Sequence, residues 1–291
     1  MTALLRIESV GVQATVQDLG RPGYAAIGVT AGGAADRTSL QRANRIVGNP
    51  PGAAAIEIVL GLFSATVLAD TVVSVTGAPC PLRINGRAAT TETALHVSTD
   101  DRIVLDRPPT GLRSYLALAG GIAGDTLLGS LSSSPSMGLG RTPLGPGDIA
   151  TGAGAPGEVP VSETFGRWHQ GTRLVSAMPG PRADDFADDA LDLLFASTWR
   201  AGNELDRVGI RLDGPSLAPR SDAAATMASE PVVRGAIQVS PDGRPTVFLA
   251  DHPVTGGYPV IAVVADADTD ELAQLTPGDE VRFRRTTPAW K

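Results

Sequence analysis

Residues 236–266, with the sequence AIQVSPDGRPTVFLADHPVTGGYPVIAVVAD, carry the clearest strand pattern in this chain. Apolar residues alternate with other residues over 237–240 and 246–250, on either side of Pro241-Asp242-Gly243. This arrangement predicts a β-hairpin whose glycine adopts a positive φ angle. The apolar run 260–265 predicts a third strand, so the segment indicates a β-rich fold.

The loop that joins the second and third of these strands, DHPVTGGY, is the first candidate for a functional site. Its paired glycines would let backbone amides approach a ligand, and its polar side chains would supply contacts. The candidate base in this loop is Asp251, and the candidate substrate-binding residues are Thr255, Gly256, Gly257 and Tyr258. A tight structural connection with incidental polar residues would produce the same pattern, so both interpretations stay open.

The composition favours many short strands and turns over long helices. The 291 residues include 34 Gly and 23 Pro, and only 4% are aromatic. The formal net charge is −7 without a basic cluster, which argues against nucleic acid or an anionic membrane as a partner. The single cysteine, Cys80, excludes an intramolecular disulfide, and no apolar run approaches the roughly 18 residues that span a bilayer. We therefore expect a soluble, cytoplasmic protein.

Lysine is nearly absent, because Lys291 is the one lysine of the chain. A phosphate-binding loop of the Gly-x4-Gly-Lys-Ser/Thr kind needs a lysine that reaches the β- and γ-phosphates. The nearest match, GDTLLGS at 124–130, has none. Covalent biotin needs a lysine too, so the chain offers no internal position for it. We expect any ATP or carboxybiotin chemistry to depend mostly on another polypeptide.

A polar turn near the N-terminus, TVQDLGRPGY at 15–24, is the second candidate site. Gln17 and Arg21 would orient amide and carboxylate groups of a substrate, because glutamine offers a donor and an acceptor and arginine a bidentate fork. Gln238, on the hairpin, is expected to act with them across a cleft between two β lobes. Asp18 is a second candidate base, although simple pairing of Asp18 with Arg21 explains the turn equally well.

Two further polar residues interrupt apolar patterns. Asp36 predicts the N-cap of a helix over 37–47, and Asn44 shares the apolar face of that helix. Asn44 is either a hydrogen-bonded core residue or a contact to a substrate. Glu57 lies within the apolar run AAAIEIVLGLF, where burial would raise its pKa and suit it to acid or base catalysis. A salt bridge to an arginine is the alternative for Glu57.

A long polar loop over 129–148 offers another possible contact to an anion, through the hydroxyls of 132–134 and the guanidinium of Arg141. Flexibility of the loop is the alternative interpretation. Further along, the segment 203–212 predicts one strand with Arg207 and Arg211 on the same side, as candidate substrate contacts.

The second half of the chain again shows many strands and few helices. Residues 181–197 predict a helix, and a Gly/Ala/Pro-rich stretch at 151–171 predicts a linker. The three histidines are scattered, and the acidic run DADTDELAQLTP has Glu and Pro where a calcium loop needs Gly and Glu, so we predict no metal site. We predict two β-barrel-like domains with minor helix, spanning 1–165 and 166–291.

Several long motifs occur in the chain in a fixed order: TVQDLGRPGY, GVTAGGAADRTSLQRANRIVGNP, SYLALAGGI, GLGR with LGPGD, DRVGIRLDG, and GAIQVSPDGRPTVFLADHPVTGGYPVIAVV with QLTPGDEVRF. In this order they resemble the KipA family, whose other names are allophanate hydrolase subunit 2, the C subunit of 5-oxoprolinase and the biotin-dependent carboxyltransferase family. The resemblance covers nearly the whole chain. One departure is Gly129-Ser130-Leu131-Ser132-Ser133, where the family often has Gly-Ser-Arg-Ser-Thr.

The resemblance implies tandem cyclophilin-like β-barrel domains and a partner of the KipI type, called allophanate hydrolase subunit 1 or the B subunit of 5-oxoprolinase. It implies a part in the ATP-dependent hydrolysis of 5-oxoproline, with the A subunit of 5-oxoprolinase as a third component, or in the metabolism of urea and allophanate. ATP would act at the level of the complex. The alternative is a regulator without chemistry of its own that binds a KipI-type inhibitor of a kinase.

Overall fold

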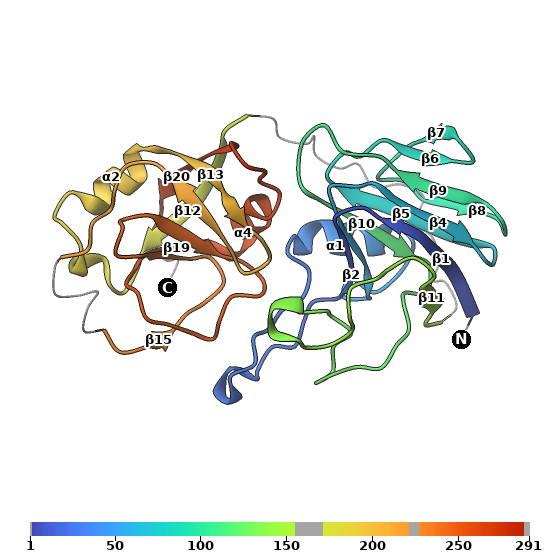
Figure 1. Ribbon diagram of the computed structural model, residues 1–291, viewed down its shortest axis with the longest axis horizontal. Coiled ribbons are helices and arrows are strands. Elements are labelled where there is room, and N and C mark those ends of the chain that lie inside the picture. Colours follow the sequence, from blue (N-terminus) through green and yellow to red (C-terminus); the bar gives the residue numbers. More distant parts are fainter. Residues whose placement is uncertain (1, 155–170, 221–226, 288–291) are drawn as a thin grey trace. The chain divides into compact units, whose positions relative to one another are not determined.

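The computed structural model describes residues 2–154, 171–220 and 227–287, and these residues form two compact units (Figure 1). Unit 1 holds residues 1–21 and 32–168, and unit 2 holds residues 22–31 and 169–291. Both units consist mainly of β-strands, which confirms the predicted mainly β fold. Most of the predicted linker, 155–170, lies outside the described residues. No helix in the described part of the chain is long and apolar enough to cross a membrane.

Unit 1 consists of two antiparallel sheets of six and five strands. The strands of the first sheet, in spatial order, are β11 (Ile149–Gly152), β1 (Thr2–Val10), β4 (Phe63–Val67), β9 (Arg102–Leu105), β6 (Leu82–Ile84) and β7 (Arg87–Ala89). Those of the second are β2 (Gln13–Gln17), β3 (Ala55–Val59), β10 (Arg113–Leu118), β5 (Thr71–Gly77) and β8 (Leu95–Val97). The turn Asn85-Gly86 joins β6 to β7 with positive φ at both residues, as a type I′ hairpin requires.

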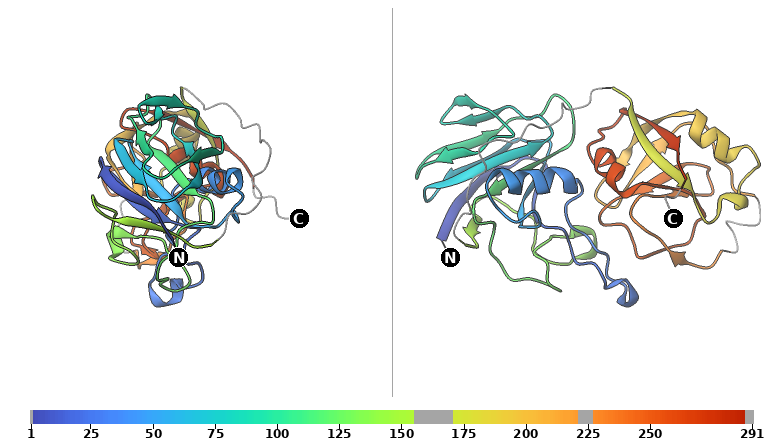
Figure 2. Two further views of the ribbon diagram at one scale, coloured as in Figure 1. Left: turned by 90° about the vertical axis from the view of Figure 1, so that its right-hand side faces the viewer. Right: turned by 180° about the vertical axis from the view of Figure 1, so that it is seen from behind.

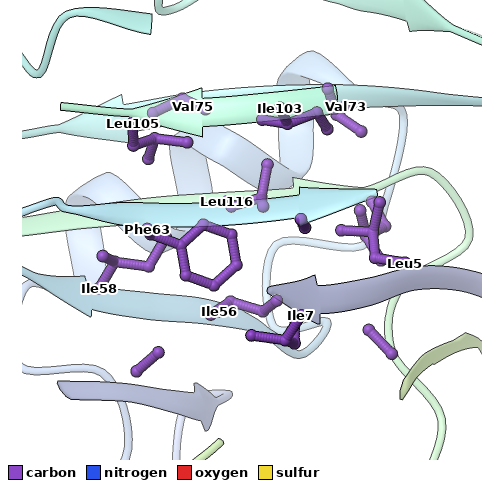
Figure 3. Packing of buried hydrophobic residues seen from close by; sticks show 14 of the residues in the cluster. Leu5, Ile7, Ile56, Ile58, Phe63, Val73, Val75, Ile103, Leu105 and Leu116 are labelled. Atoms are coloured by element: carbon purple, nitrogen blue, oxygen red, sulfur yellow. The ribbon is translucent and has the colours of Figure 1, made fainter. Parts of the chain in front are cut away.

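The core of unit 1 fills the space between its two sheets (Figure 3). Alternate residues of each strand point inward, so that Leu5 and Ile7 of β1 meet Ile56 and Ile58 of β3, with Phe63 of β4 between them. All five side chains are fully buried. Burial of each stabilises the fold by about 1.5–3 kcal/mol.

Helix α1 (Arg37–Ile46) packs on the five-stranded sheet (Figure 2). Its N-cap is Asp36, whose side chain accepts a hydrogen bond from the Ser39 amide at 2.8 Å. Leu40 and Ala43 of the helix pack against residues of β10, including Tyr115. The predicted helix is therefore confirmed, and it ends one residue before the predicted end.

Unit 2 is a closed seven-stranded barrel. Around the barrel the strands are β12 (Arg173–Pro179), β19 (Val260–Val264), β16 (Ala236–Val239), β17 (Pro245–Phe248), β14 (Gly209–Asp213), β13 (Thr198–Leu205) and β20 (Glu280–Arg285). A separate pair joins β15 (Glu230–Pro231) to β18 (Thr255–Gly256). The hairpin predicted around Pro241-Asp242-Gly243 connects β16 to β17, and Gly243 has a φ of +79°. The hairpin prediction is confirmed.

The helices of unit 2 are short. Among the described residues they are α2 (Ala190–Ala196) and α4 (Asp266–Leu272), both labelled in Figure 1, and the 3-10 helices η1 (Ala25–Ile27) and η3 (Ala183–Asp185). The 3-10 helix η2 (Pro135–Met137) lies in unit 1.

The continuous helix predicted over 181–197 is wrong. It is divided into η3 and α2 at Phe186, whose backbone is extended, with φ −110° and ψ 170°. Phe186 is buried in the barrel core and forms an isolated bridge with Pro219. The extended backbone that seats this ring in the core is incompatible with helical dihedral angles, so the helix cannot continue through it.

The single strand predicted over 203–212 is also wrong, because β13 and β14 form a hairpin there. The side chain of Asp206 closes the turn by accepting hydrogen bonds from the amides of Val208 at 2.7 Å and Gly209 at 3.1 Å. Arg207 therefore lies in a turn and Arg211 on a strand. The two side chains contact different partners and do not share one side of a strand.

Candidate functional site

The polar turn after β2 is covered by a loop from far along the sequence. We call residues 127–141 the serine loop. The amide of Ser133 donates to the Val16 carbonyl at 3.0 Å, and beyond the loop the amide of Leu144 donates to the Ala14 carbonyl at 2.8 Å. These bonds continue the hydrogen bonding of β2 at its outer edge. They place the serine loop directly against the side chains of Gln17, Asp18 and Arg21.

Asp18 fastens the serine loop to the turn that follows β2. Its Oδ1 accepts hydrogen bonds from the hydroxyls of Ser130 at 2.7 Å and Ser132 at 2.5 Å, and from the Gly20 amide at 2.7 Å. Its Oδ2 accepts from the Leu131 amide at 2.7 Å. Both carboxylate oxygens are therefore occupied. Arg21 donates to backbone carbonyls of the serine loop instead, so the pairing with Asp18 that is the alternative for this turn is not found among the described residues.

The Arg21 side chain is buried beneath the same loop, with 1% of its surface exposed. Its Nε donates to the Leu127 carbonyl at 3.3 Å, and its Nη2 donates to the Ser132 carbonyl. Gly140 packs against this contact, and a Cβ added there would lie 2.2 Å from the Ser132 oxygen and 3.1 Å from Nη2 of Arg21. The close approach requires glycine at position 140.

Three buried polar atoms in this region have no hydrogen-bond partner among the described residues. They are Oε1 of Gln17, Nη1 of Arg21 and Oγ of Ser134. Gln17 is anchored through its Nε2, which donates to the Ser133 carbonyl at 2.8 Å and to Thr15 Oγ1 at 3.0 Å. An unsatisfied buried polar group costs about 1–3 kcal/mol, and more where it is charged. We call Gln17, Arg21 and Ser134 the Arg21 cluster.

The sequence reveals the Arg21 cluster only in part. It predicts Gln17 and Arg21 as substrate contacts, and the structure brings them to one place. The run of serines indicates an anion contact, but the Ser133 hydroxyl donates to the backbone carbonyl of Arg141. The unpartnered hydroxyl is that of Ser134, and no local pattern distinguishes it from its neighbours.

In unit 2, Asp251 forms a buried ion pair with Arg207. Nε of Arg207 donates to Oδ2 of Asp251 at 3.0 Å, and Nη2 donates to Oδ1 at 3.0 Å. The side chains of Arg207 and Asp251 are 6% and 0% exposed. Because both oxygens of Asp251 are engaged, it is not placed as a free base. The pair instead joins the β13–β14 turn to the start of the loop that follows β17.

The remainder of that loop is held by Gln238, whose Nε2 donates to the Tyr258 carbonyl at 2.9 Å. Gly256 lies in β18, and a Cβ added there would be 2.3 Å from Nε2 of Gln238. The glycine therefore permits a close approach within the protein. Thr255, Gly257 and the Tyr258 ring are exposed. The predicted residues of this loop thus lie near one another in the structure. The side-chain amide of Gln238 is used in a hydrogen bond to the loop itself.

Arg211 lies on the outer part of the barrel among acidic side chains. Its guanidinium contacts Glu204 at 3.3 Å, Ser240 at 3.3 Å and Asp242. A hydrogen bond from Ser240, together with the charge of Arg211, keeps the pKa of Asp242 below its ordinary value. Arg211 therefore stabilises the β16–β17 hairpin, and the structure does not bring it to the Asp251 loop.

Glu57 lies inside unit 1, in β3, and its carboxylate is buried. Oε2 accepts hydrogen bonds from the Ala35 amide at 3.0 Å and the Tyr115 hydroxyl at 2.7 Å, and Oε1 lies 3.6 Å from Nε of Arg113. Burial, followed by the nearby Glu57 carboxylate, raises the pKa of Tyr115 well above its ordinary value. The salt bridge considered as the alternative for Glu57 is present, and it leaves no accessible carboxylate for catalysis.

Asn44 is likewise part of the core, which is the first of the two alternatives given for it. Its Nδ2 donates to the carbonyls of Ala53 at 2.7 Å and Pro51 at 3.3 Å, and its Oδ1 accepts from Asn49 at 3.0 Å. Asn44 joins helix α1 to the turn that leads into β3. The structure therefore shows Asn44 as a hydrogen-bonded core residue.

A separate groove of about 660 Å³ lies in unit 1, between strands of the two sheets. It contains none of the predicted site residues. Its ionisable side chains are Asp70 and His96, and its walls include Leu4, Val72 and Val97. In the described part of the chain no group of three or more His, Cys, Asp or Glu side chains could hold a metal ion.

The chain matches one protein-family model over most of its length. The model is that of the carboxyltransferase domain, subdomain A and B, and it matches residues 27–285. The chain belongs to this carboxyltransferase domain family. The family resemblance in the sequence is thereby confirmed. The predicted domain boundary near residue 165 and the cleft between the units stay predictions.

Relatives of this carboxyltransferase domain include bacterial enzyme subunits of similar length. It is 34% identical over 283 residues to the C subunit of 5-oxoprolinase from Escherichia coli, covering 96% of this chain and 90% of the relative. It is 28% identical over 286 residues to the corresponding 5-oxoprolinase subunit of Haemophilus influenzae, with the same coverage. The solved structure of the Kluyveromyces lactis urea amidolyase matches with a TM-score of 0.91 and 27% identity. The match covers 98% of this chain and 19% of that one, so this chain corresponds to a small part of the larger enzyme.

Proposed function

We propose that this carboxyltransferase domain is one component of an ATP-dependent complex that hydrolyses a small amide, either 5-oxoproline or allophanate. The observation that carries the proposal is the 34% identity to the C subunit of 5-oxoprolinase from Escherichia coli, which extends over 90% of that subunit. Near-complete coverage means that the two chains share a whole architecture and not one motif. The 27% identity to a urea amidolyase keeps allophanate as the alternative substrate.

The chemistry explains why such a chain would work with partners. An amide resists hydrolysis because resonance protects its carbonyl carbon and nitrogen is a poor leaving group, so activation at the expense of ATP makes the reaction accessible. This chain has one lysine, Lys291, and no phosphate-binding loop. We therefore assign ATP to the partners, which are a KipI-type protein, corresponding to the B subunit of 5-oxoprolinase, and a third protein corresponding to its A subunit. The same lack of an internal lysine excludes covalent biotin from the body of this chain.

The contribution of this chain, in our proposal, is to bind and orient the substrate. The predicted bases Asp18, Asp251 and Glu57 each have both carboxylate oxygens engaged by other groups. A carboxylate held in this way positions its neighbours more readily than it accepts a proton. The Arg21 cluster, by contrast, retains unused donors and an unused acceptor.

Reconstitution tests the proposal. The purified chain is mixed with the KipI-type protein and the third 5-oxoprolinase component from the same organism, and glutamate formed from 5-oxoproline and ammonia formed from allophanate are measured with and without ATP. We expect ATP-dependent turnover of one of the two amides, and only when all components are present. Absence of turnover on both, from a complex that assembles, would contradict the enzymatic assignment.

The occupied carboxylates also favour a second candidate, a regulator that binds a KipI-type kinase inhibitor without chemistry of its own. The same reconstitution separates the two. The regulator predicts a stable complex with the KipI-type protein and relief of kinase inhibition, with no product from either amide.

A further inference from the structure

The Arg21 cluster combines three unused hydrogen-bonding atoms of complementary kinds. Nη1 of Arg21 is a cationic donor, Oε1 of Gln17 is an acceptor, and Oγ of Ser134 is both. The three residues are 1%, 0% and 0% exposed, so bulk water does not satisfy these atoms. A buried guanidinium and a buried amide oxygen normally have hydrogen-bond partners. The absence of such partners here points to a ligand group that binds between Arg21 and Gln17.

Neighbouring contacts anchor Arg21 and Gln17 against consecutive residues of the serine loop, next to Ser134. Nη2 of Arg21 is bonded to the Ser132 carbonyl, and Nε2 of Gln17 to the Ser133 carbonyl at 2.8 Å. Ser134 is the next residue along the same stretch, and its amide bonds to the Leu139 carbonyl at 2.9 Å. The anchored atoms of Arg21 and Gln17 fix the orientation of their free atoms. The Gln17 amide cannot be reversed without placing its oxygen against the Ser133 carbonyl.

We infer that the Arg21 cluster binds a small carboxylate that carries an N–H donor one or two bonds from its carboxyl carbon. Arg21 Nη1 and the Ser134 hydroxyl donate to the carboxylate, and Gln17 Oε1 accepts from the N–H. The inference rests on the proposed function for its choice of ligands, because 5-oxoproline and allophanate both have this arrangement. The inference adds to the proposed function the residues that would select these two ligands. The serine loop must open to admit the ligand, since the three atoms are enclosed beneath it.

Ligand analogues test the two halves of the inference separately. Binding of 5-oxoproline to the full chain, and to the reconstituted complex, is measured by titration calorimetry beside 2-pyrrolidinone, which lacks the carboxylate, and N-methyl-5-oxoproline, which lacks the N–H. We expect each analogue to bind at least about tenfold more weakly, because each leaves a buried group of the cluster unpaired. Equal binding of 5-oxoproline and both analogues would overturn the inference.

Ser134→Ala is the most informative variant, with Ser133→Ala as its matched control. The Ser134 hydroxyl has no partner among the described residues, so its removal should leave the stability of unit 1 unchanged or higher while the affinity for 5-oxoproline falls about two- to tenfold. The Ser133 hydroxyl is bonded to the Arg141 carbonyl, so its removal should lower stability and keep the affinity within about twofold. Unchanged affinity in Ser134→Ala would contradict the inference.

The outcomes distinguish this inference from the proposed function. Turnover of 5-oxoproline with identical kinetics in the wild type and Ser134→Ala would support the function and overturn the site. Selective binding of carboxylates that is lost in Ser134→Ala, without turnover of either amide, would support the site and contradict the function. A crystal structure grown with 5-oxoproline that shows only water beside Arg21 would also overturn the site.

Discussion

Asp251→Asn should destabilise unit 2, because the Arg207 guanidinium would lose a buried counterion. The side chains of Arg207 and Asp251 are 6% and 0% exposed and share two hydrogen bonds of 3.0 Å. Removing one partner of a buried ion pair costs about 3–5 kcal/mol. The asparagine oxygen can still accept one of the two bonds, so we expect a loss near 3 kcal/mol, or roughly a hundredfold in the unfolding equilibrium.

Urea unfolding followed by tryptophan fluorescence measures this loss. Trp199 is fully buried in the barrel, and its indole Nε1 donates to the Leu194 carbonyl at 3.0 Å, so its emission should change when the barrel unfolds. A midpoint for Asp251→Asn equal to that of the wild type would refute the claim that the pair is buried and coupled.

The double variant Arg207→Met with Asp251→Leu separates structure from catalysis. Replacing a buried ion pair by apolar side chains of similar volume is often neutral or stabilising, so the double variant should recover most of the stability that Asp251→Asn loses. If Asp251 only positions its loop, the reconstituted complex that contains the double variant should regain both the stability and the turnover that Asp251→Asn loses. Recovered stability without turnover would instead support Asp251 as a base.

Two further substitutions test the scaffold of unit 1. Gly140→Ala places a Cβ 2.2 Å from the Ser132 oxygen and should accelerate hydrogen exchange in the serine loop. The control is Gly138→Ala, where φ is similarly positive but a Cβ would meet no atom within 4 Å. It should show only the backbone cost of about 1–2 kcal/mol. Tyr115→Phe removes the hydroxyl bonded to Glu57 and should cost about 3 kcal/mol in urea unfolding at about pH 8. Burial raises the pKa of Tyr115 in the folded state, so above about pH 10 the unfolded chain loses the phenol proton first. The stabilising contribution of the hydroxyl therefore falls as pH rises, and the difference in free energy of unfolding between Tyr115→Phe and wild type should narrow. A difference that widens would contradict this assignment.

Local signals predict the elements whose structure is set by a few consecutive residues. Gly243 and the pair Asn85-Gly86 require positive φ, and each marks a hairpin in the structure. Asp36 caps helix α1 as predicted, because an N-cap bond joins residues three apart. These preferences act over four residues or fewer and do not depend on the rest of the fold.

Tertiary contacts account for the predictions that failed. Phe186 interrupts an otherwise helical pattern because the barrel core takes up its ring, and neither propensity nor charge indicates this. The partner of Asp251 is 44 residues away, and the loop that surrounds Asp18 is more than 110 residues away. A polar residue in a pattern indicates that it needs a partner, but the identity of the partner depends on how distant strands are placed.

The distinction between paired and unpaired buried groups changes where function is sought in this chain. Sequence reasoning favours the carboxylates, since Asp and Glu within apolar or glycine-rich segments are typical catalytic bases. In the structure each of those carboxylates is balanced by donors, so its charge is already stabilised in the folded state. The Arg21 cluster is not balanced, and the folded chain carries the free-energy cost of its unused atoms until a ligand supplies the missing bonds. That cost is recovered only by a molecule with matching donors and acceptors, which makes the unpaired atoms a source of binding selectivity.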